Sequence, residues 1–322
     1  MIKISNESPI LSIVIATYNH RAYIARALDS VLNQVTDYSC EILIGDDCST
    51  DGTQDIIHQY ESLYPEYFNV YYRKTNMFKQ KLGNMLDLIL RTKGKYLIVL
   101  EGDDFWTDNS KIQKQIRFLE LNQEYIAVAH LCTVVGADSK PLPEIYPQCR
   151  DSEYTFDHYK RFLLPGQTTT ILMRNIYINN KIDTSLIFKR YSPGDRSIAF
   201  TLISNGKIFC IQEVMSAYRH VTTGGSSYSA NFKPNFGKNQ KLLQGLYEYA
   251  EKIDNSQAIS CAKYLYIKGL VHGFIRRKVT FQQLLSCLSL IKRPFLFTLV
   301  EIAINDIIRF PLSIVDRVFT EK

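Results

Sequence analysis

Residues 94–106 read Gly94-Lys-Tyr-Leu-Ile-Val-Leu-Glu-Gly-Asp-Asp-Phe-Trp106, an apolar run that ends in an acidic turn. The run Tyr96–Leu100 predicts a buried strand because it is apolar and bounded by turn residues. Two earlier runs have the same form: Ile10–Ala16 is followed by Thr17-Tyr-Asn19, and Glu41–Gly45 by Asp46-Asp47. The carboxyl ends of parallel strands meet at one edge of a sheet, so we expect the three polar clusters to gather there.

Helical periodicity separates these runs, so the first 135 residues predict an α/β fold with a Rossmann-like, mixed or mostly parallel sheet flanked by helices. The expected helices are Ala22–Leu32, a helix through Ile56 to Tyr60, Leu82–Leu90 and Asn109–Leu121, with further strands at Asn69–Tyr72 and Ala127–Val135. Residues 136–161 read as loop. Beyond them we expect strands at Thr168–Met173, Lys207–Ile211 and Val214–Arg219, and a short helix at Ile198–Ser204.

The acidic pairs suggest a metal site. One Asp-Asp pair is usually a solvated turn, but Asp46-Asp47 and Asp103-Asp104 each follow a buried strand. Carboxylates gathered at one edge repel each other unless a cation or hydrogen-bond donors compensate them. Mg²⁺ and Mn²⁺ prefer oxygen ligands and commonly bridge a carboxylate to substrate phosphates. These residues therefore predict a metal–diphosphate site without specifying the reaction.

Composition narrows the class of protein. The chain has 322 residues, of which 46% are hydrophobic and 22% charged, as in packed globular proteins. No uncharged run reaches the ~18 residues of a membrane-spanning helix, and the polar start does not resemble a secretory signal. The seven cysteines form no CxxC pair, which favours reduced thiols over a zinc site. We therefore expect a cytoplasmic protein.

The three quoted segments, in this order and spacing, resemble the inverting family two glycosyltransferases of bacterial polysaccharide synthesis. Those enzymes have the GT-A fold and use nucleotide-sugar donors, and the resemblance covers about residues 9–220. It implies nucleotide-binding roles for Thr17, Tyr18, Asn19, Asp46, Asp47, Asn84 and Asp103. It implies a divalent cation, Mn²⁺ or Mg²⁺, held by Asp104 with His220, and diphosphate or sugar contacts for Arg219, Glu101 and Trp106. Glu101 stands where many members carry a further Asp. For Trp106, packing beside the site is the alternative.

The resemblance also implies a catalytic base on the acceptor side. Ser192-Pro-Gly-Asp195-Arg196 resembles the segment that supplies it, although Gly194-Asp195 replaces the common Glu-Asp pair. Asp195 is the only acidic residue between Asp183 and Glu213. The alternative role for Asp195 is the N-cap of the following helix, and both roles can coexist.

The resemblance implies a transferase that works in one displacement with inversion. UDP is the expected carrier, with dTDP and GDP as the alternatives, and a lipid-linked or oligosaccharide acceptor in capsule or O-antigen synthesis is the expected partner. The alternative is a non-catalytic nucleotide-sugar-binding or partner subunit with the same fold. A nucleotidyltransferase is disfavoured because Thr17-Tyr-Asn-His-Arg21 lacks a glycine-rich phosphate loop. Nucleic-acid binding is disfavoured because the basic residues alternate with apolar helical faces.

The chain divides by charge. Residues 233–322 carry 14 Lys and Arg against 7 Asp and Glu, while the whole chain has a net charge of +6. We expect a GT-A domain at 1–229 and a basic, mostly helical region at 230–322, with helices near Gly237–Ile253, Gln257–Arg277, Phe281–Ile291 and Phe295–Phe319. The clusters Arg276-Arg277-Lys278 and Lys292-Arg293 favour peripheral attachment to an anionic membrane at its inner face. For the apolar helix Phe295–Phe319, packing against the transferase domain or another subunit is the alternative. A homo-oligomer is left open.

Overall fold

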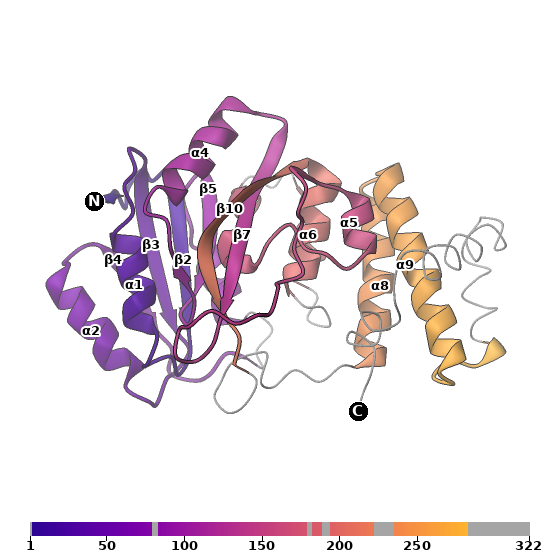
Figure 1. The fold of residues 1–322 in the computed structure, drawn as a ribbon, viewed down its shortest axis with the longest axis horizontal. Helices are drawn as coiled ribbons and strands as arrows, with labels where there is room; N and C mark the ends of the chain where they lie inside the picture. Colours follow the sequence, from indigo (N-terminus) through magenta and orange to yellow (C-terminus); the bar gives the residue numbers. More distant parts are fainter. Residues whose placement is uncertain (1, 79–82, 179–181, 189–193, 222–234, 283–322) are drawn as a thin grey trace.

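The computed structural model describes residues 2–78, 83–178, 182–188, 194–221 and 235–282. In this part of the chain a single mixed sheet runs through the molecule in the order β1-β3-β2-β5-β9-β7-β10-β6. Strand β4 pairs with β3, and β8 pairs with β10, beside this path. Helices lie against both faces of the sheet, and α8 and α9 lie at the end of the molecule opposite α2 (Figure 1).

The N-terminal half of the sheet is parallel, as the sequence predicts. Strands β2, β3, β4 and β5 pair in parallel around the central strand β2, with Thr17 beside Asp46 and Ala16 beside Glu101. The elements here are β1 (Lys3–Ile4), β2 (Leu11–Thr17), α1 (Ile24–Leu32), β3 (Ser39–Asp46), α2 (Thr53–Leu63), β4 (Phe68–Tyr72), α3 (Asn84–Ile89), β5 (Tyr96–Glu101), β6 (Phe105–Trp106) and α4 (Lys111–Leu121). The three polar clusters therefore meet at one edge of the sheet.

The core has a layer on each face of this sheet because successive side chains of a strand point to opposite faces. Ile13 and Ile15 of β2 pack with α1 and α4 on one face. Val14 packs on the other face, in the same cluster as α3, α6, α8 and α9. The alternation in the sequence thus becomes two apolar layers that fix the strand ends in place.

The C-terminal half of the sheet is mixed. Strand β9 (Leu172–Arg174) lies between β5 and β7 (Tyr125–Val135) and is antiparallel to both. Strand β10 (Lys207–Arg219) runs parallel to β7 and antiparallel to β6. The two strands expected at 207–219 are thus one strand, with an irregularity between Ile211 and Val214 where the polar pair Gln212-Glu213 interrupts the apolar pattern.

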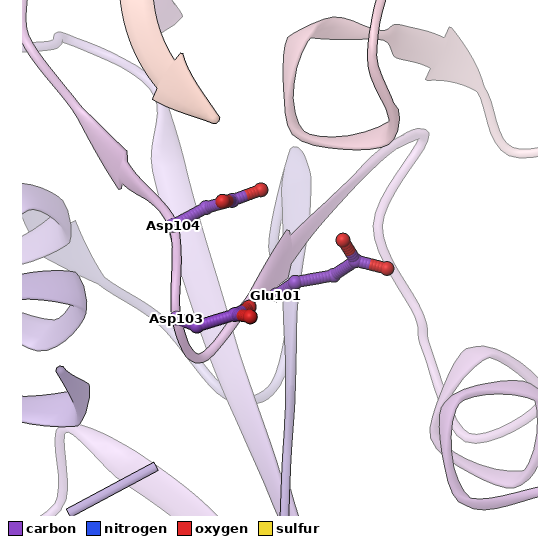
Figure 2. A group of neighbouring side chains, drawn as sticks. All are labelled: Glu101, Asp103 and Asp104. Atoms are coloured by element: carbon purple, nitrogen blue, oxygen red, sulfur yellow. The ribbon is translucent and has the colours of Figure 1, made fainter. Parts of the chain in front are cut away.

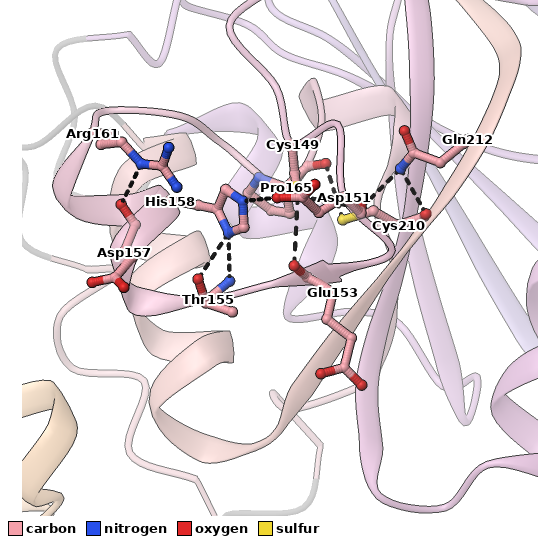
Figure 3. Close-up of polar contacts among 10 residues, drawn as sticks. All are labelled: Cys149, Asp151, Glu153, Thr155, Asp157, His158, Arg161, Pro165, Cys210 and Gln212. Carbon is pink, nitrogen blue, oxygen red and sulfur yellow. Dashed lines mark hydrogen bonds and ion pairs between the residues drawn. The ribbon is translucent and has the colours of Figure 1, made fainter. Parts of the chain in front are cut away.

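The segment expected to be loop from 136 to 161 holds two short elements, β8 (Glu153–Tyr154) and α5 (Phe156–Lys160). His158 organises this segment, as Figure 3 shows: its Nδ1 accepts from the backbone N–H of Thr155 at 3.0 Å and its Nε2 lies 2.7 Å from a carboxylate oxygen of Asp151. Gln212 of β10 donates to the carbonyl oxygen of Asp151 at 2.8 Å. These side-chain contacts order a segment whose composition favours loop.

Two further boundaries differ from the sequence prediction. Residues 168–170 form the 3-10 turn η1 (Thr168–Thr170) rather than strand. The side chain of Gln167 accepts from the N–H of Thr169 at 2.7 Å, which holds this turn. Helix α6 (Gly194–Asn205) begins four residues before the expected Ile198, so Asp195 lies in its first turn and not at an N-cap.

Helices α8 (Phe236–Lys252) and α9 (Ser256–Ile275) confirm the expected helical character of 237–253 and 257–277. Leu246 of α8 and Leu265 of α9 belong to the same apolar cluster as α6. The proposed boundary at 229 and the expected helix at Phe295–Phe319 lie outside the described residues. Within the described residues, no helix is both long enough and apolar enough to cross a bilayer.

Candidate active site

A tight turn between β5 and β6 brings three carboxylates together. Glu101, Asp103 and Asp104 each offer an oxygen within 4.8 Å of the others (Figure 2). The backbone N–H of Asp104 donates to the carbonyl oxygen of Glu101 at 3.0 Å and closes the turn. A Cβ at Gly102 would lie 2.7 Å from Oγ1 of Thr17, so only glycine lets this turn approach the end of β2 so closely.

The carboxylates carry more negative charge than their surroundings compensate. Asp104 is 1% exposed, and burial together with the charges of Asp103 and Glu101 raises its pKa well above the usual range. Burial, with the charges of Asp103 and Asp195, likewise raises the pKa of Glu101. A divalent cation on oxygen ligands would relieve this repulsion. The donor set and its charge therefore fit Mg²⁺ or Mn²⁺.

Gln167, which no sequence motif singles out, joins two of the carboxylates. Its Nε2 donates to Oε2 of Glu101 at 3.2 Å and to Oδ2 of Asp104 at 3.0 Å. Its Oε1 accepts from the backbone and hydroxyl of Thr169, which fixes the amide orientation. The one signal in the sequence is the polar stretch Gln167-Thr-Thr-Thr170 at a place where the apolar pattern predicts strand.

Arg219 is buried and holds the acidic turn from the other side. Its Nε donates to the carbonyl oxygen of Asp103 at 2.8 Å. Its Nη1 donates to the carbonyl oxygen of Gly136 at 2.6 Å. The guanidinium also lies 4.0 Å from the ring centre of Tyr23. These contacts give Arg219 a structural task, and its contact with a diphosphate stays a prediction.

Three polar atoms beside the cluster are buried without a hydrogen-bond partner among the described residues: Oγ1 of Thr17, Nδ1 of His20 and Oδ1 of Asp46. The other oxygen of Asp46 accepts from the N–H of Ser49 at 2.9 Å, so the carboxylate is held in one orientation. His20 Nε2 lies 3.7 Å from Oδ2 of Asp103, and burial lowers the pKa of His20. Buried polar groups are normally paired, so these atoms indicate a ligand site at the ends of β2 and β3. His20 has no ligand spacing in the sequence, so its place here comes from the structure alone.

The other expected nucleotide ligands shape the loops around these atoms. Asn19 Oδ1 accepts from the N–H of Thr50 at 2.9 Å, and Asp47 Oδ1 accepts from the N–H of Met77 at 2.6 Å. Asn84 donates to the carbonyl oxygen of Gly45 at 2.7 Å. Tyr18 is half-buried beside Thr17. Direct nucleotide contacts of these four side chains stay predictions.

Asp195 comes to this site from α6. Its charge contributes to the raised pKa of Glu101. Its Oδ1 accepts from the N–H of Arg196 at 2.7 Å, and burial raises the pKa of Asp195. A carboxylate with a raised pKa accepts a proton more readily, which suits a general base.

His220 and Trp106 have protein partners in the structure. His220 Nδ1 pairs with Oε2 of Glu144, and the carboxylate group described above does not include His220. Trp106 is 5% exposed and its Nε1 donates to the carbonyl oxygen of Thr169 at 3.2 Å. Trp106 therefore packs beneath the site. The metal role of His220 stays a prediction.

Comparisons with known proteins agree with this geometry. The sequence model of glycosyl transferase family 2 matches residues 12–183. The uncharacterized protein Rv1520 of Mycobacterium tuberculosis is 31% identical over 224 residues, which are 66% of this chain and 60% of that protein, so the chain spans about three fifths of that relative. The Escherichia coli protein named UDP-Glc:alpha-D-GlcNAc-diphosphoundecaprenol beta-1,3-glucosyltransferase WfaP is 33% identical over 274 residues, 83% of this chain and 97% of WfaP.

Among solved structures, Staphylococcus aureus TarS (residues 1–349, crystallised with UDP-GlcNAc) has a TM-score of 0.61 at 14% identity, covering 82% of this chain and 72% of that one. A likeness at this identity concerns the fold. It confirms the expected GT-A architecture with additional C-terminal helices.

Proposed function

The chain belongs to glycosyl transferase family 2, and on that premise we propose that it transfers a sugar from a UDP-sugar to a hydroxyl of a lipid-linked saccharide, with inversion, during synthesis of a surface polysaccharide. The observation that carries this proposal is the gathering of the carboxylates Glu101, Asp103 and Asp104 at the edge of the sheet, with the charge of Asp195 acting on Glu101. The name of WfaP, which specifies a UDP-linked donor and a diphosphoundecaprenol-linked acceptor, supports these substrate classes.

In this proposal the donor nucleotide binds at the ends of β2 and β3. Oγ1 of Thr17 and Oδ1 of Asp46, which have no hydrogen-bond partner among the described residues, take the polar edge of the base. Asp103, whose Oδ2 lies 3.7 Å from Nε2 of His20, binds the ribose. Because Asp46 is already oriented by Ser49, little conformational freedom is lost when it binds the nucleotide.

Asp104 is the principal ligand that would hold Mn²⁺ or Mg²⁺, with Glu101 and Asp103 beside it. His220, which pairs with Glu144, would have to leave that partner to join them. When bound there, a divalent cation would neutralise the charge that develops on the departing diphosphate. Gln167 and the backbone N–H of Arg219 keep both oxygens of Asp104 in place, at 3.0 and 2.7 Å.

Asp195 acts as the general base on the acceptor side. Its carboxylate takes the proton from the acceptor hydroxyl while that oxygen forms a bond to the anomeric carbon. The bond between this carbon and the diphosphate oxygen breaks in the same step, and UDP leaves. A single displacement inverts the anomeric centre and needs no covalent sugar–enzyme intermediate.

The end of α9 supports a peripheral position at a membrane, where a lipid-linked acceptor would be found. Phe274, Ile275 and Phe281 are 40%, 70% and 60% exposed, and the basic run Arg276-Arg277-Lys278 between them is exposed as well. Exposed apolar side chains next to basic ones suit an anionic lipid surface. Residues 283–322, including Lys292-Arg293, lie outside the described part.

The proposal is tested by UDP release from UDP-glucose and UDP-N-acetylglucosamine, measured with and without Mn²⁺ and an undecaprenyl-diphosphate-linked sugar. We expect metal-dependent release that the acceptor accelerates. The alternative, a non-catalytic nucleotide-sugar-binding subunit, predicts that the same donors raise the melting temperature but are neither hydrolysed nor transferred.

A further inference from the structure

The segment after β7 carries a tyrosine to the edge of the carboxylate cluster. Beyond Val135 the chain turns back, and the N–H of Leu142 donates to the carbonyl oxygen of Val134 at 2.8 Å. Farther along, Nε2 of Gln148 donates to the carbonyl oxygen of Cys132 at 3.4 Å. Tyr146 lies between these two attachment points, so the chain is tied to β7 on both sides of it.

This segment is stiff as well as attached. Pro141, Pro143 and Pro147 stand in the stretch Pro141-Leu-Pro-Glu-Ile-Tyr-Pro147, and each proline fixes its own φ angle. A side chain presented by such a segment loses little backbone freedom when a ligand binds. Tyr146 is thus held in advance of binding.

The ring of Tyr146 meets Tyr218 of β10 edge to face, with 5.2 Å between the ring centres. Strand β6 runs antiparallel to β10 with Phe105 opposite Ala217, so Asp104, just before Phe105, lies beside Tyr218, just after Ala217. Tyr218, half-buried, therefore lies beside the acidic turn, and Tyr146, also half-buried, packs against Tyr218.

The hydroxyl of Tyr146 stays protonated beside these acids. Burial raises the pKa of Tyr146 well above its usual range, and the charges of Asp195 and Glu101 raise it further. The hydroxyl is consequently a hydrogen-bond donor on the side of the proposed base.

We propose that Tyr146 and Tyr218 form the subsite for the acceptor sugar. The Tyr146 ring packs against the apolar C–H face of a pyranose, and its hydroxyl donates to a sugar oxygen next to the hydroxyl that Asp195 deprotonates. A rigid aromatic wall with one placed polar group is the usual composition of a small-ligand site. The inference rests on the proposed function, since it takes Asp195 to be the base.

The test is saturation-transfer difference NMR on the full chain with UDP present, using the methyl glycosides of glucose, galactose and N-acetylglucosamine as probes. Tyr146→Phe removes only the hydroxyl, and Tyr146→Leu removes the ring. We expect the dissociation constant of the bound glycoside to rise about 5-fold in Tyr146→Phe and at least about 10-fold in Tyr146→Leu. UDP affinity should stay within about twofold. The matched control is Tyr247→Phe, a tyrosine of α8 whose hydroxyl donates to Glu251 at 2.8 Å.

A glycoside signal that both Tyr146 variants leave unchanged, or that the wild type does not give, overturns the subsite. Glycoside binding that depends on Tyr146 in a protein that transfers no sugar upholds the subsite and refutes the proposed function. Sugar transfer with an unchanged acceptor KM in Tyr146→Leu overturns the subsite and upholds the proposed function. The Tyr146→Phe variant keeps the ring and its contact with Tyr218, so a folding defect of Tyr146→Leu does not decide the outcome.

Discussion

The backbone N–H of Arg219 donates a hydrogen bond of 2.7 Å to Oδ1 of Asp104, joining the end of β10 to the acidic turn after β5. Gln167 donates to the other oxygen of Asp104 at 3.0 Å. Both oxygens of one buried carboxylate are therefore fixed by groups that are distant in the sequence. This arrangement keeps the acidic turn in shape while negative charge remains available to a cation.

Asp104→Asn should remove the Mn²⁺ dependence of UDP binding. The amide keeps the size of the side chain and one acceptor oxygen, but it loses the charge that favours a divalent cation. The measurement is the melting temperature with UDP, with and without Mn²⁺. Asp138→Asn, an exposed acid that pairs with Lys140, is the control and should keep the wild-type response. An unchanged Mn²⁺ effect in Asp104→Asn would show that the metal is held elsewhere.

Gln167→Met should lower the free energy of unfolding by about 1–3 kcal/mol, because Glu101 and Asp104 lose a shared donor in a buried place. It should also change the affinity for Mn²⁺, since Gln167 orients the proposed ligands. Urea unfolding and Mn²⁺ titration measure the two effects. The control is Gln123→Met, at an exposed glutamine whose side chain donates to the backbone carbonyl oxygen of Glu120. A loss of stability with unchanged Mn²⁺ affinity would limit Gln167 to a structural role.

The buried His130 should make the protein less stable in mild acid. Burial lowers the pKa of His130 well below 6.5, with a further lowering by Lys111. As pH falls below about 6.5, the unfolded chain binds a proton at this histidine and the folded protein does not, so stability falls with pH. The other charged groups that act on His130 are Asp108, which raises its pKa, and Lys114, which lowers it.

Between pH 7 and pH 5, the free energy of unfolding should therefore fall by about 2 kcal/mol less in His130→Asn than in the wild type. Urea unfolding at the two pH values measures this difference. His58→Asn, at an exposed histidine of α2, is the control for replacing a histidine elsewhere in the chain. Parallel pH curves for wild type and His130→Asn would mean that the folded protein accepts the proton.

Replacing Arg276, Arg277 and Lys278 together by serine should weaken binding to vesicles that contain anionic lipid. Each basic residue near such a surface contributes ~1 kcal/mol, so the three account for several kcal/mol at low salt. Flotation in low and high salt measures the loss, with deletion of residues 276–322 as the extreme case. Lys238→Ser with Lys241→Ser, at exposed positions on α8, is the matched control. Equal recovery of the wild type from neutral and anionic vesicles would contradict the attachment.

The sequence predicts the sheet and its acidic edge because the information is local. Each strand is an apolar run with polar residues directly after it, as at Tyr96–Glu101 followed by Asp103 and Asp104. Such a run is buried because its own side chains are apolar, so the strand can be predicted without knowing its partners in the fold. The order and spacing of three of these runs then suffice for the resemblance to the family.

The partners within the site could not be predicted, because they depend on contacts between distant residues. Gln167 lies 63 residues from Asp104, and Glu144 lies 76 residues from His220. Helix α5 is stabilised by the pairing of His158 with Asp151, which the loop-like composition of 136–161 conceals. Tertiary contacts of this kind override local propensity.

Inversion by Asp195 is the central claim, and the anomeric form of the first sugar released by hydrolysis of UDP-glucose tests it most directly. UDP-glucose is α-linked, so ¹H NMR at early times, before the anomers equilibrate, should show β-glucose as the first product. Asp195→Asn should slow this release at least ~100-fold and leave UDP affinity within about twofold, because the base faces the acceptor. First release of α-glucose, or an Asp195→Asn variant that keeps its rate, would contradict the account.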